Sequence, residues 1–188
     1  MAKSKEGFTI VELLVVIVVI AILAAITLVS YNGIQRRAHN TVTTGAVSQW
    51  IKVLTASYLA NGVVTVELPA GDNSFCLGTK EQYPYISEDL KEGQCYIHAH
   101  TSDELNNFIS EMANVSMSTY VTKDGSYPFR GIQYVWTEAD DETHLWYNLE
   151  GEDQDCAVQG SEIAATGNGI TECHIVVSDI IGANPIRN

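Results

Sequence analysis

The sequence predicts an α+β fold in which one long N-terminal helix packs on a small antiparallel sheet. Residues 8–28 form an almost continuous apolar run, helical spacing continues after it to about Ala60, and the remaining chain contains short segments rich in β-branched and aromatic residues. Charge divides along the same line. Residues 1–60 hold five Lys/Arg and two acids, a net of +3, whereas residues 61–188 hold five Lys/Arg and 21 acids, a net of −16. A C-terminal part this acidic disfavours general binding to nucleic acid.

The apolar run is long enough to cross a membrane. No charged residue lies between Leu13 and Gln35, and about 20 apolar residues span a hydrocarbon core of about 30 Å. Ala24-Ala25 resembles the cleavage site of an ordinary secretory signal, but the apolar pattern continues past it. One acid, Glu12, lies near the start of the run. Burying its charge in hydrocarbon would cost roughly 2.5–3.5 kcal/mol, so this carboxylate requires a physical reason.

The stretch GFTIVELLVVIVVIAILAAI resembles the class III signal of type IV pilins and of their relatives, the pseudopilins. The resemblance implies that a prepilin peptidase cuts after Gly7 and methylates the new amino terminus at Phe8. Glu12 is then the fifth mature residue and can pair with the amine of a neighbouring subunit, because a buried charge is tolerated best beside an opposite one. Phe8 and Glu12 are therefore the expected assembly residues. The alternative is a plain membrane anchor with Glu12 at the level of the lipid headgroups.

The resemblance divides the chain into three parts. Residues 1–7 are the leader, residues 8–60 are one long helix with 8–28 as membrane span and filament core, and residues 61–188 are an extracytoplasmic α+β head. Beyond the membrane the helix is amphipathic, since apolar residues recur every four positions from Val42 to Tyr58. Asn61-Gly62 provides a stop signal. Gly33 and Gly45 are weak points, each costing about 1 kcal/mol relative to alanine.

The head is predicted to be a minimal two-layer structure. Strands are expected at 131–137, 144–151 and 172–178, where β-branched and aromatic residues gather, and the acidic turn EADDE joins the first two as a hairpin. A further short strand is expected at 63–68. Thr101 and Glu104 have capping-box spacing at the start of a short helix over 101–112. Three antiparallel strands laid over an amphipathic helix give the α+β arrangement.

Four cysteines lie in the acidic part, and they allow three disulfide pairings. The resemblance implies export and therefore oxidation. We expect Cys76–Cys95 and Cys156–Cys173, because each pair encloses one contiguous loop, with a stabilisation of about 3 kcal/mol each in the chain-entropy model. The second pair would hold residues 157–172 against the last strand. This segment of glycines and small polar residues is expected to be an exposed loop, like the variable C-terminal region of pilins.

Other site chemistry has weak support, and no cofactor or catalytic role is expected. Glu152, Asp153 and Asp155 are oxygen ligands suited to calcium, but they lack a calcium-loop pattern, so a solvated acidic loop is the default. His98 and His100 have the spacing of two metal ligands, yet no third ligand lies at a recognised spacing. A nucleophile elbow and a phosphate-binding glycine loop are both absent from the sequence.

The resemblance implies a structural subunit of a type IV pilus-like surface filament. It would lie in the cytoplasmic membrane as a single-pass protein with its head outside, and would then polymerise through its N-terminal helix into an extracellular filament. Its expected partners are copies of itself, a prepilin peptidase, the inner-membrane assembly machinery and membrane lipid. Two alternatives remain open. One is a pseudopilin of a type II secretion system, and the other is a minor pilin, adhesin or DNA-uptake subunit whose head binds a ligand.

Overall fold

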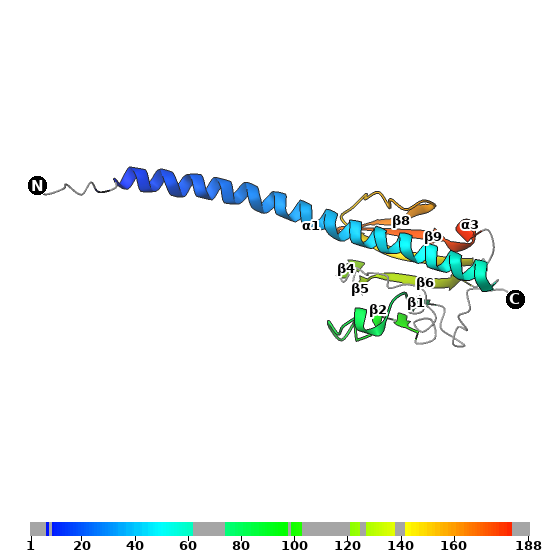
Figure 1. Ribbon diagram of the computed structural model, residues 1–188. Helices are drawn as coiled ribbons and strands as arrows, with labels where there is room; N and C mark the ends of the chain where they lie inside the picture. Colours follow the sequence, from blue (N-terminus) through cyan, green and yellow to red (C-terminus); the bar gives the residue numbers. More distant parts are fainter. Residues whose placement is uncertain are drawn as a thin grey trace, which may run out of the picture. The chain divides into compact units, whose positions relative to one another are not determined.

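The computed structural model describes residues 7, 9–61, 74–97, 99–102, 121–124, 127–137 and 142–181. The chain forms two compact units, Met1–Ala38 and His39–Asn188. One helix, α1, runs through the division between them. The elements, shown in Figure 1, are α1 (Ile10–Asn61), β1 (Ser74–Cys76), the 3-10 turn η1 (Lys80–Gln82), β2 (Gln94–Tyr96), β3 (Ala99–Thr101), β4 (Val121–Asp124), β5 (Tyr127–Arg130), β6 (Ile132–Thr137), β7 (Glu142–Glu150), β8 (Ser161–Gly167), β9 (Ile170–Val176) and α3 (Val177–Ile181).

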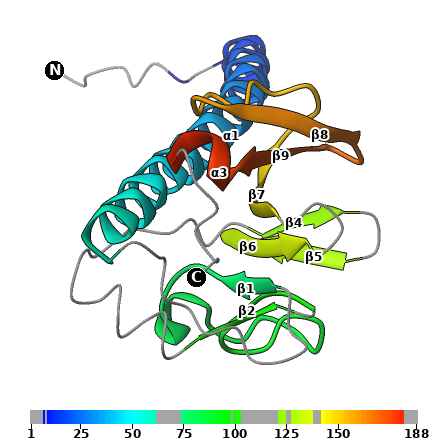
Figure 2. The same cartoon turned by 90° about the vertical axis from the view of Figure 1, so that its right-hand side faces the viewer.

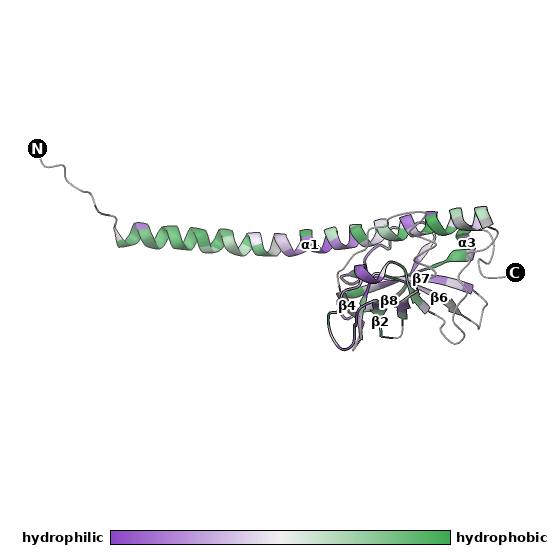
Figure 3. Cartoon of the chain, turned by 60° about the horizontal axis from the view of Figure 1, so that its bottom comes forward, coloured by the Kyte–Doolittle hydropathy of each residue, from purple (hydrophilic) through white to green (hydrophobic). Residues whose placement is uncertain are grey.

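The first unit consists of the apolar half of α1. Its large apolar side chains between Ile10 and Leu28 are 49 to 79% exposed. Because almost every residue of this run is apolar, they occupy every side of the helix, and the ribbon of this half is coloured hydrophobic over nearly its whole length in Figure 3. Within the part of the chain that the structure describes, α1 is the one helix long and apolar enough to cross a membrane. The helix is continuous through Gly33 and Gly45, and a Cβ added at either glycine would meet nothing within 4 Å. Packing within the chain therefore requires neither glycine.

The second unit is built on a seven-stranded sheet with the order β2-β3-β1-β6-β7-β9-β8 (Figure 2). All neighbouring strands are antiparallel except β1 and β3, which are parallel. The strands β4 and β5 form a separate two-stranded sheet. The predicted α+β class is confirmed, and β6, β7 and β9 occupy the positions of the three expected strands.

The predicted three-stranded sheet was too small, and one part of the prediction was wrong. Residues 157–172 were expected to form an exposed loop, but Ser161–Gly167 form β8, which pairs with β9 at the edge of the sheet. Most of the side chains of β8 are exposed. Because β8 contributes little to the core, its composition lacks the apolar alternation that marks a half-buried strand. The predicted strand at 63–68 and all but the first two residues of the predicted helix 101–112 lie outside the described residues; Thr101 itself ends β3.

The core lies between the sheet and the second half of α1. The helix contributes Ala46, Val47, Trp50, Val53 and Leu54, each no more than 9% exposed. The predicted stripe is therefore confirmed from Ala46 onward, but not at its expected start, since Val42 is 47% exposed. The sheet contributes alternate residues of its strands, because successive side chains of a strand point to opposite faces. These inward residues include Ile132, Tyr134, Leu145, Tyr147, Leu149, Cys173 and Ile175. The short helix α3 adds Val177 to the same cluster.

Disulfides link Cys76 to Cys95 and Cys156 to Cys173, and all four cysteines are almost fully buried. The Cα atoms are 5.5 Å apart in the first pair and 5.9 Å apart in the second. Tyr147 supports the second bridge, because its buried hydroxyl donates to the carbonyl of Cys156 at 3.0 Å. Burial raises the pKa of Tyr147 to about 12, so this hydroxyl remains a donor at physiological pH.

Arg130, at the end of β5, organises the segment closed by the first disulfide. Arg130 is 1% exposed, and its guanidinium donates to three backbone carbonyls rather than to a carboxylate within the described residues. Nε donates to the carbonyl of Gln94 at 2.8 Å, Nη1 to that of Pro84 at 2.7 Å and Nη2 to that of Lys91 at 3.1 Å. The guanidinium also lies 5.4 Å from the centre of the Tyr83 ring, a cation–π distance. Burial lowers the pKa of Arg130.

Gly131 follows Arg130 and permits the close approach of Tyr83. Its φ is +72°, and an added Cβ would lie 2.6 Å from the Tyr83 hydroxyl oxygen. That hydroxyl donates to the carbonyl of Leu77 at 2.5 Å. A side chain at position 131 would therefore be strained by both the backbone angle and the contact.

We expect Arg130→Met to destabilise the head by about 3 kcal/mol, because three carbonyls lose their common charged donor. Chemical denaturation of the full chain in detergent, followed by tryptophan fluorescence, would measure this loss. The matched control is Lys80→Met. Lys80 is half-exposed, with its amine 3.6 Å from Glu92, and such surface pairs contribute about 0–1 kcal/mol. Equal stabilities of the two variants would contradict a structural role for Arg130.

Candidate assembly and processing site

The candidate site is the N-terminal end of α1, where Thr9 and Glu12 form a reciprocal cap. The backbone N–H and the hydroxyl of Thr9 donate to Glu12 Oε2 at 2.8 and 2.7 Å. In return, the backbone N–H of Glu12 donates to the Thr9 hydroxyl at 3.3 Å. The first N–H groups of any helix have no partner within the helix, and this arrangement satisfies two donors at once. It is a capping box, with Thr9 at the N-cap and Glu12 three residues later.

The cap explains how Glu12 is held, and the sequence carried its signal. The spacing Thr-x-x-Glu before an apolar run is a known start signal for helices, but we predicted a capping box only at Thr101 and Glu104. A carboxylate at this position also interacts favourably with the helix dipole. Because a carboxylate offers about four acceptor positions, the two bonds from Thr9 leave capacity for a further donor. The carboxylate is thus oriented at the exposed tip of the helix, ready to accept from another molecule.

Gly7 immediately precedes this cap. It is exposed, and a Cβ at this position would meet nothing within 4 Å. The described part of the chain therefore imposes no steric need for glycine at position 7. A requirement for a small residue there would come from an enzyme that binds the segment. Phe8, the expected methylated residue, lies outside the described residues.

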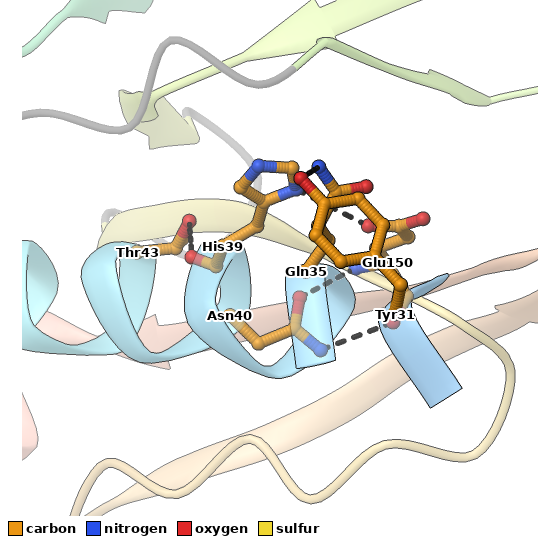
Figure 4. A network of polar contacts seen from close by, with 6 residues as sticks. All are labelled: Tyr31, Gln35, His39, Asn40, Thr43 and Glu150. Atoms are coloured by element: carbon orange, nitrogen blue, oxygen red, sulfur yellow. Dashed lines mark hydrogen bonds and ion pairs between the residues drawn. The ribbon is translucent and has the colours of Figure 1, made fainter. Parts of the chain in front are cut away.

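A second polar cluster fixes the start of the head-bound part of α1 (Figure 4). The Asn40 side-chain amide bonds twice to the backbone of Glu150 at the end of β7: Nδ2 donates to the carbonyl at 3.0 Å, and Oδ1 accepts from the N–H at 2.8 Å. His39 Nδ1 lies 3.3 Å from the Glu150 carboxylate. Through these two bonds, the Asn40 side chain pairs with the backbone C=O and N–H of Glu150 as a neighbouring strand would. The sequence showed no signal for the contact, because the two residues are 110 positions apart.

The residues considered for calcium instead shape the turn between β7 and β8. Glu152 accepts from the N–H of Gly169 at 3.1 Å, and Asp155 accepts from the N–H of Ala157 at 2.9 Å. Asp153 has a positive φ of 52° and donates its own N–H to Thr166. Across the described ranges, no three His, Cys, Asp or Glu side chains are grouped so as to hold a metal ion. His100 lies on β3, whereas His98 is outside the described residues.

We expect Thr9→Ala to weaken the first turn of α1 by about 1 kcal/mol, since it removes the side-chain half of the cap. Glu12→Gln should leave that turn nearly intact, because glutamine serves at the same position of a capping box. Hydrogen exchange of the amides of residues 10–13 in detergent micelles would compare the two variants. Faster exchange in Glu12→Gln than in Thr9→Ala would mean that the charge, not the cap geometry, maintains this turn.

Comparison with known proteins identifies the N-terminal signal. Residues 2–28 match the family described as the prokaryotic N-terminal methylation motif, and no solved structure matches the chain. This motif is the class III signal of type IV pilins, and it implies processing by a prepilin peptidase and pilus assembly. Proteins of the pilin type are generally structural rather than enzymatic. The motif at residues 2–28, followed by an apolar helix and an α+β head, supports assignment of the chain as a type IV pilin or prepilin.

Proposed function

We propose that the chain is the precursor of a structural subunit of a type IV pilus-like surface filament. Residues 1–7 are a leader removed after Gly7, residues 8–60 are the helix that anchors and then polymerises, and residues 61–188 are the head. The observation that carries the proposal is the methylation motif at residues 2–28 on a helix whose apolar side chains are exposed on every side. The work of such a subunit is mechanical rather than catalytic.

The exposed apolar half of α1 is suited to two successive environments, first lipid and then the helices of neighbouring subunits. Soluble monomers rarely expose a continuous apolar surface of this length. No other described part of the chain covers Ile10–Leu28, and we infer that other molecules cover it. Lipid covers it in the cytoplasmic membrane, with the head on the outer side. In the filament the same residues of neighbouring subunits cover one another. The change from lipid to protein neighbours costs little hydrophobic energy, because lipid tails and leucine side chains are equally apolar.

Glu12 gives this assembly its register. Apolar helices can slide along each other with little change in energy, whereas a carboxylate in an apolar bundle must reach a positive partner. The methylated amine of Phe8 in a neighbouring subunit is the proposed partner. The Thr9 cap supports this role, because it holds the carboxylate at the helix tip and leaves acceptor capacity. The proposed partners besides other subunits are a prepilin peptidase and an inner-membrane assembly machinery.

Processing provides the first test. We expect the mature chain to begin at Phe8 with a methylated amino group, because Gly7 is the exposed small residue at the boundary between polar leader and apolar helix. Mass spectrometry of the N-terminal peptide from membranes would identify it. Gly7→Leu should leave the precursor uncut while the head remains folded, since nothing in the described structure lies within 4 Å of a Cβ at this position. A mature terminus after Ala24 or Ala25 would overturn the proposal.

Assembly provides the second test. We expect Glu12→Gln to insert into the membrane normally but to form few filaments, because losing one member of a buried charge pair typically costs 3–5 kcal/mol. Electron microscopy of filaments, with immunoblotting of the membrane pool, would separate the two steps. Thr9→Ala, which keeps the charge and loses the cap, should assemble better than Glu12→Gln. Glu88→Gln removes an exposed acid from the head and serves as the charge-matched control. Normal filament numbers from Glu12→Gln would refute the charge pairing.

A further inference from the structure

The outer face of the sheet, opposite α1, carries a pocket with a volume of about 290 Å³. The side chains of β7 alternate between the two faces, so Leu145 and Tyr147 enter the core whereas Trp146 and Asn148 point outward. The pocket lies where these outward residues meet the two-stranded β4–β5 sheet, which contributes Phe129, and β2, which contributes Tyr96. It is independent of the helix tip and of the filament core.

Aromatic rings form one half of the pocket lining. Tyr96, Phe129 and Trp146 come from three different strands. Tyr96 and Phe129 contact each other with ring centroids 6.1 Å apart and an interplanar angle of 54°. Trp146 packs on His174 of β9 at 5.1 Å between centroids, within the 4.5–7 Å typical of aromatic pairs. The rings are therefore held by neighbours on strands rather than by mobile loops.

Two uncharged amides, one carboxylate and the apolar side chain of Val135 form the rest of the lining. Gln133 of β6 lies opposite Trp146, and Asn148 of β7 lies opposite Glu172 of β9. These side chains provide both donors and acceptors. No lysine or arginine is among the described residues that line the pocket. The single carboxylate and the acidity of the head as a whole disfavour phosphates and other anions.

We propose that this pocket binds one ring of a neutral saccharide. A pyranose ring has apolar C–H faces that stack on aromatic side chains and a rim of hydroxyl groups that bond to amides and carboxylates. A purely apolar ligand would instead cover the polar side chains of Gln133, Asn148 and Glu172 and remove them from water, which costs free energy. The volume is at the small end of ligand pockets, which range from about 300 to 1,000 Å³, and it accommodates a ring rather than a folded partner.

A second, smaller hollow extends the site. Its volume is about 180 Å³, and it lies over the β8–β9 hairpin at Thr166, Gly167 and Asn168. Glu172 lines both hollows, so they adjoin at this residue. A linear oligosaccharide can place one ring against Trp146 and the next beside the hairpin. We therefore expect neutral di- and trisaccharides to bind more tightly than single sugars.

The test uses the full chain in a polyoxyethylene detergent, because a maltoside or glucoside detergent would compete for the pocket. The probes are glucose, galactose, mannose and N-acetylglucosamine, together with neutral di- and trisaccharides built from them. Saturation-transfer NMR reports which probes bind, and titration gives the dissociation constants. Trp146→Ala removes the stacking surface, and Glu172→Gln removes the shared charge with almost no change in shape. Tyr85→Ala removes an exposed aromatic ring outside the pocket and is the matched control.

We expect at least one probe to bind with a dissociation constant of about 10 mM or less. Trp146→Ala should weaken this binding by about fivefold or more, whereas Tyr85→Ala should leave it unchanged. Glu172→Gln should weaken oligosaccharides more than single sugars while keeping the unfolding midpoint of the parent chain, which excludes misfolding as the cause. The proposal fails if no probe shows saturation transfer at that concentration, or if both pocket variants bind like the parent. It also fails if N-acetyl-phenylalanine amide binds the pocket and the saccharides do not. None of these outcomes depends on filament assembly.

Discussion

The contact between Trp50 and the inner face of the sheet is the interaction on which the head depends. Trp50 is 1% exposed, and the helix residues around it cover a face formed by residues from β6, β7 and β9. Each fully buried apolar side chain contributes about 1.5–3 kcal/mol. The sheet has no other described helix of comparable length to cover this face. The second half of α1 is therefore part of the head's core as much as any strand.

This dependence gives α1 two different kinds of surface along one continuous helix. From Ala46 to Leu54 the apolar residues form a stripe, and the sheet covers it. From Ile10 to Leu28 they lie all round, and no other described part of the chain covers them. A stripe is satisfied by one partner, whereas an all-round apolar surface requires a surrounding medium. The same element thus packs on its own chain at one end and exposes apolar side chains on all sides at the other.

The features that could be predicted from the sequence are those that give a local periodic pattern of apolar residues. The helix, its buried stripe, and β6, β7 and β9 were predictable because each presents apolar residues at the spacing of its own geometry. The exposed edge strand β8 and the three-residue strands β1, β2 and β3 lack such a pattern, and their pairing is set by partners distant in the chain. Arg130 was likewise invisible, since its carbonyl partners are brought together only by the fold. The Thr9–Glu12 cap, by contrast, is local. Its spacing was sufficient to predict it, although we had not predicted a cap there.

The two disulfides limit how far the head can lengthen when it is pulled. They join residues 19 and 17 positions apart, and an extended residue spans at most about 3.3–3.6 Å. The two bridges therefore shorten the maximum extended length of the head by on the order of 110 Å, even when the head has unfolded. The loop closed by Cys76–Cys95 ends in β2, and the loop closed by Cys156–Cys173 ends in β9. Within a filament of such subunits, the bridges would limit how far each head could lengthen, whereas the contacts between subunits would remain non-covalent.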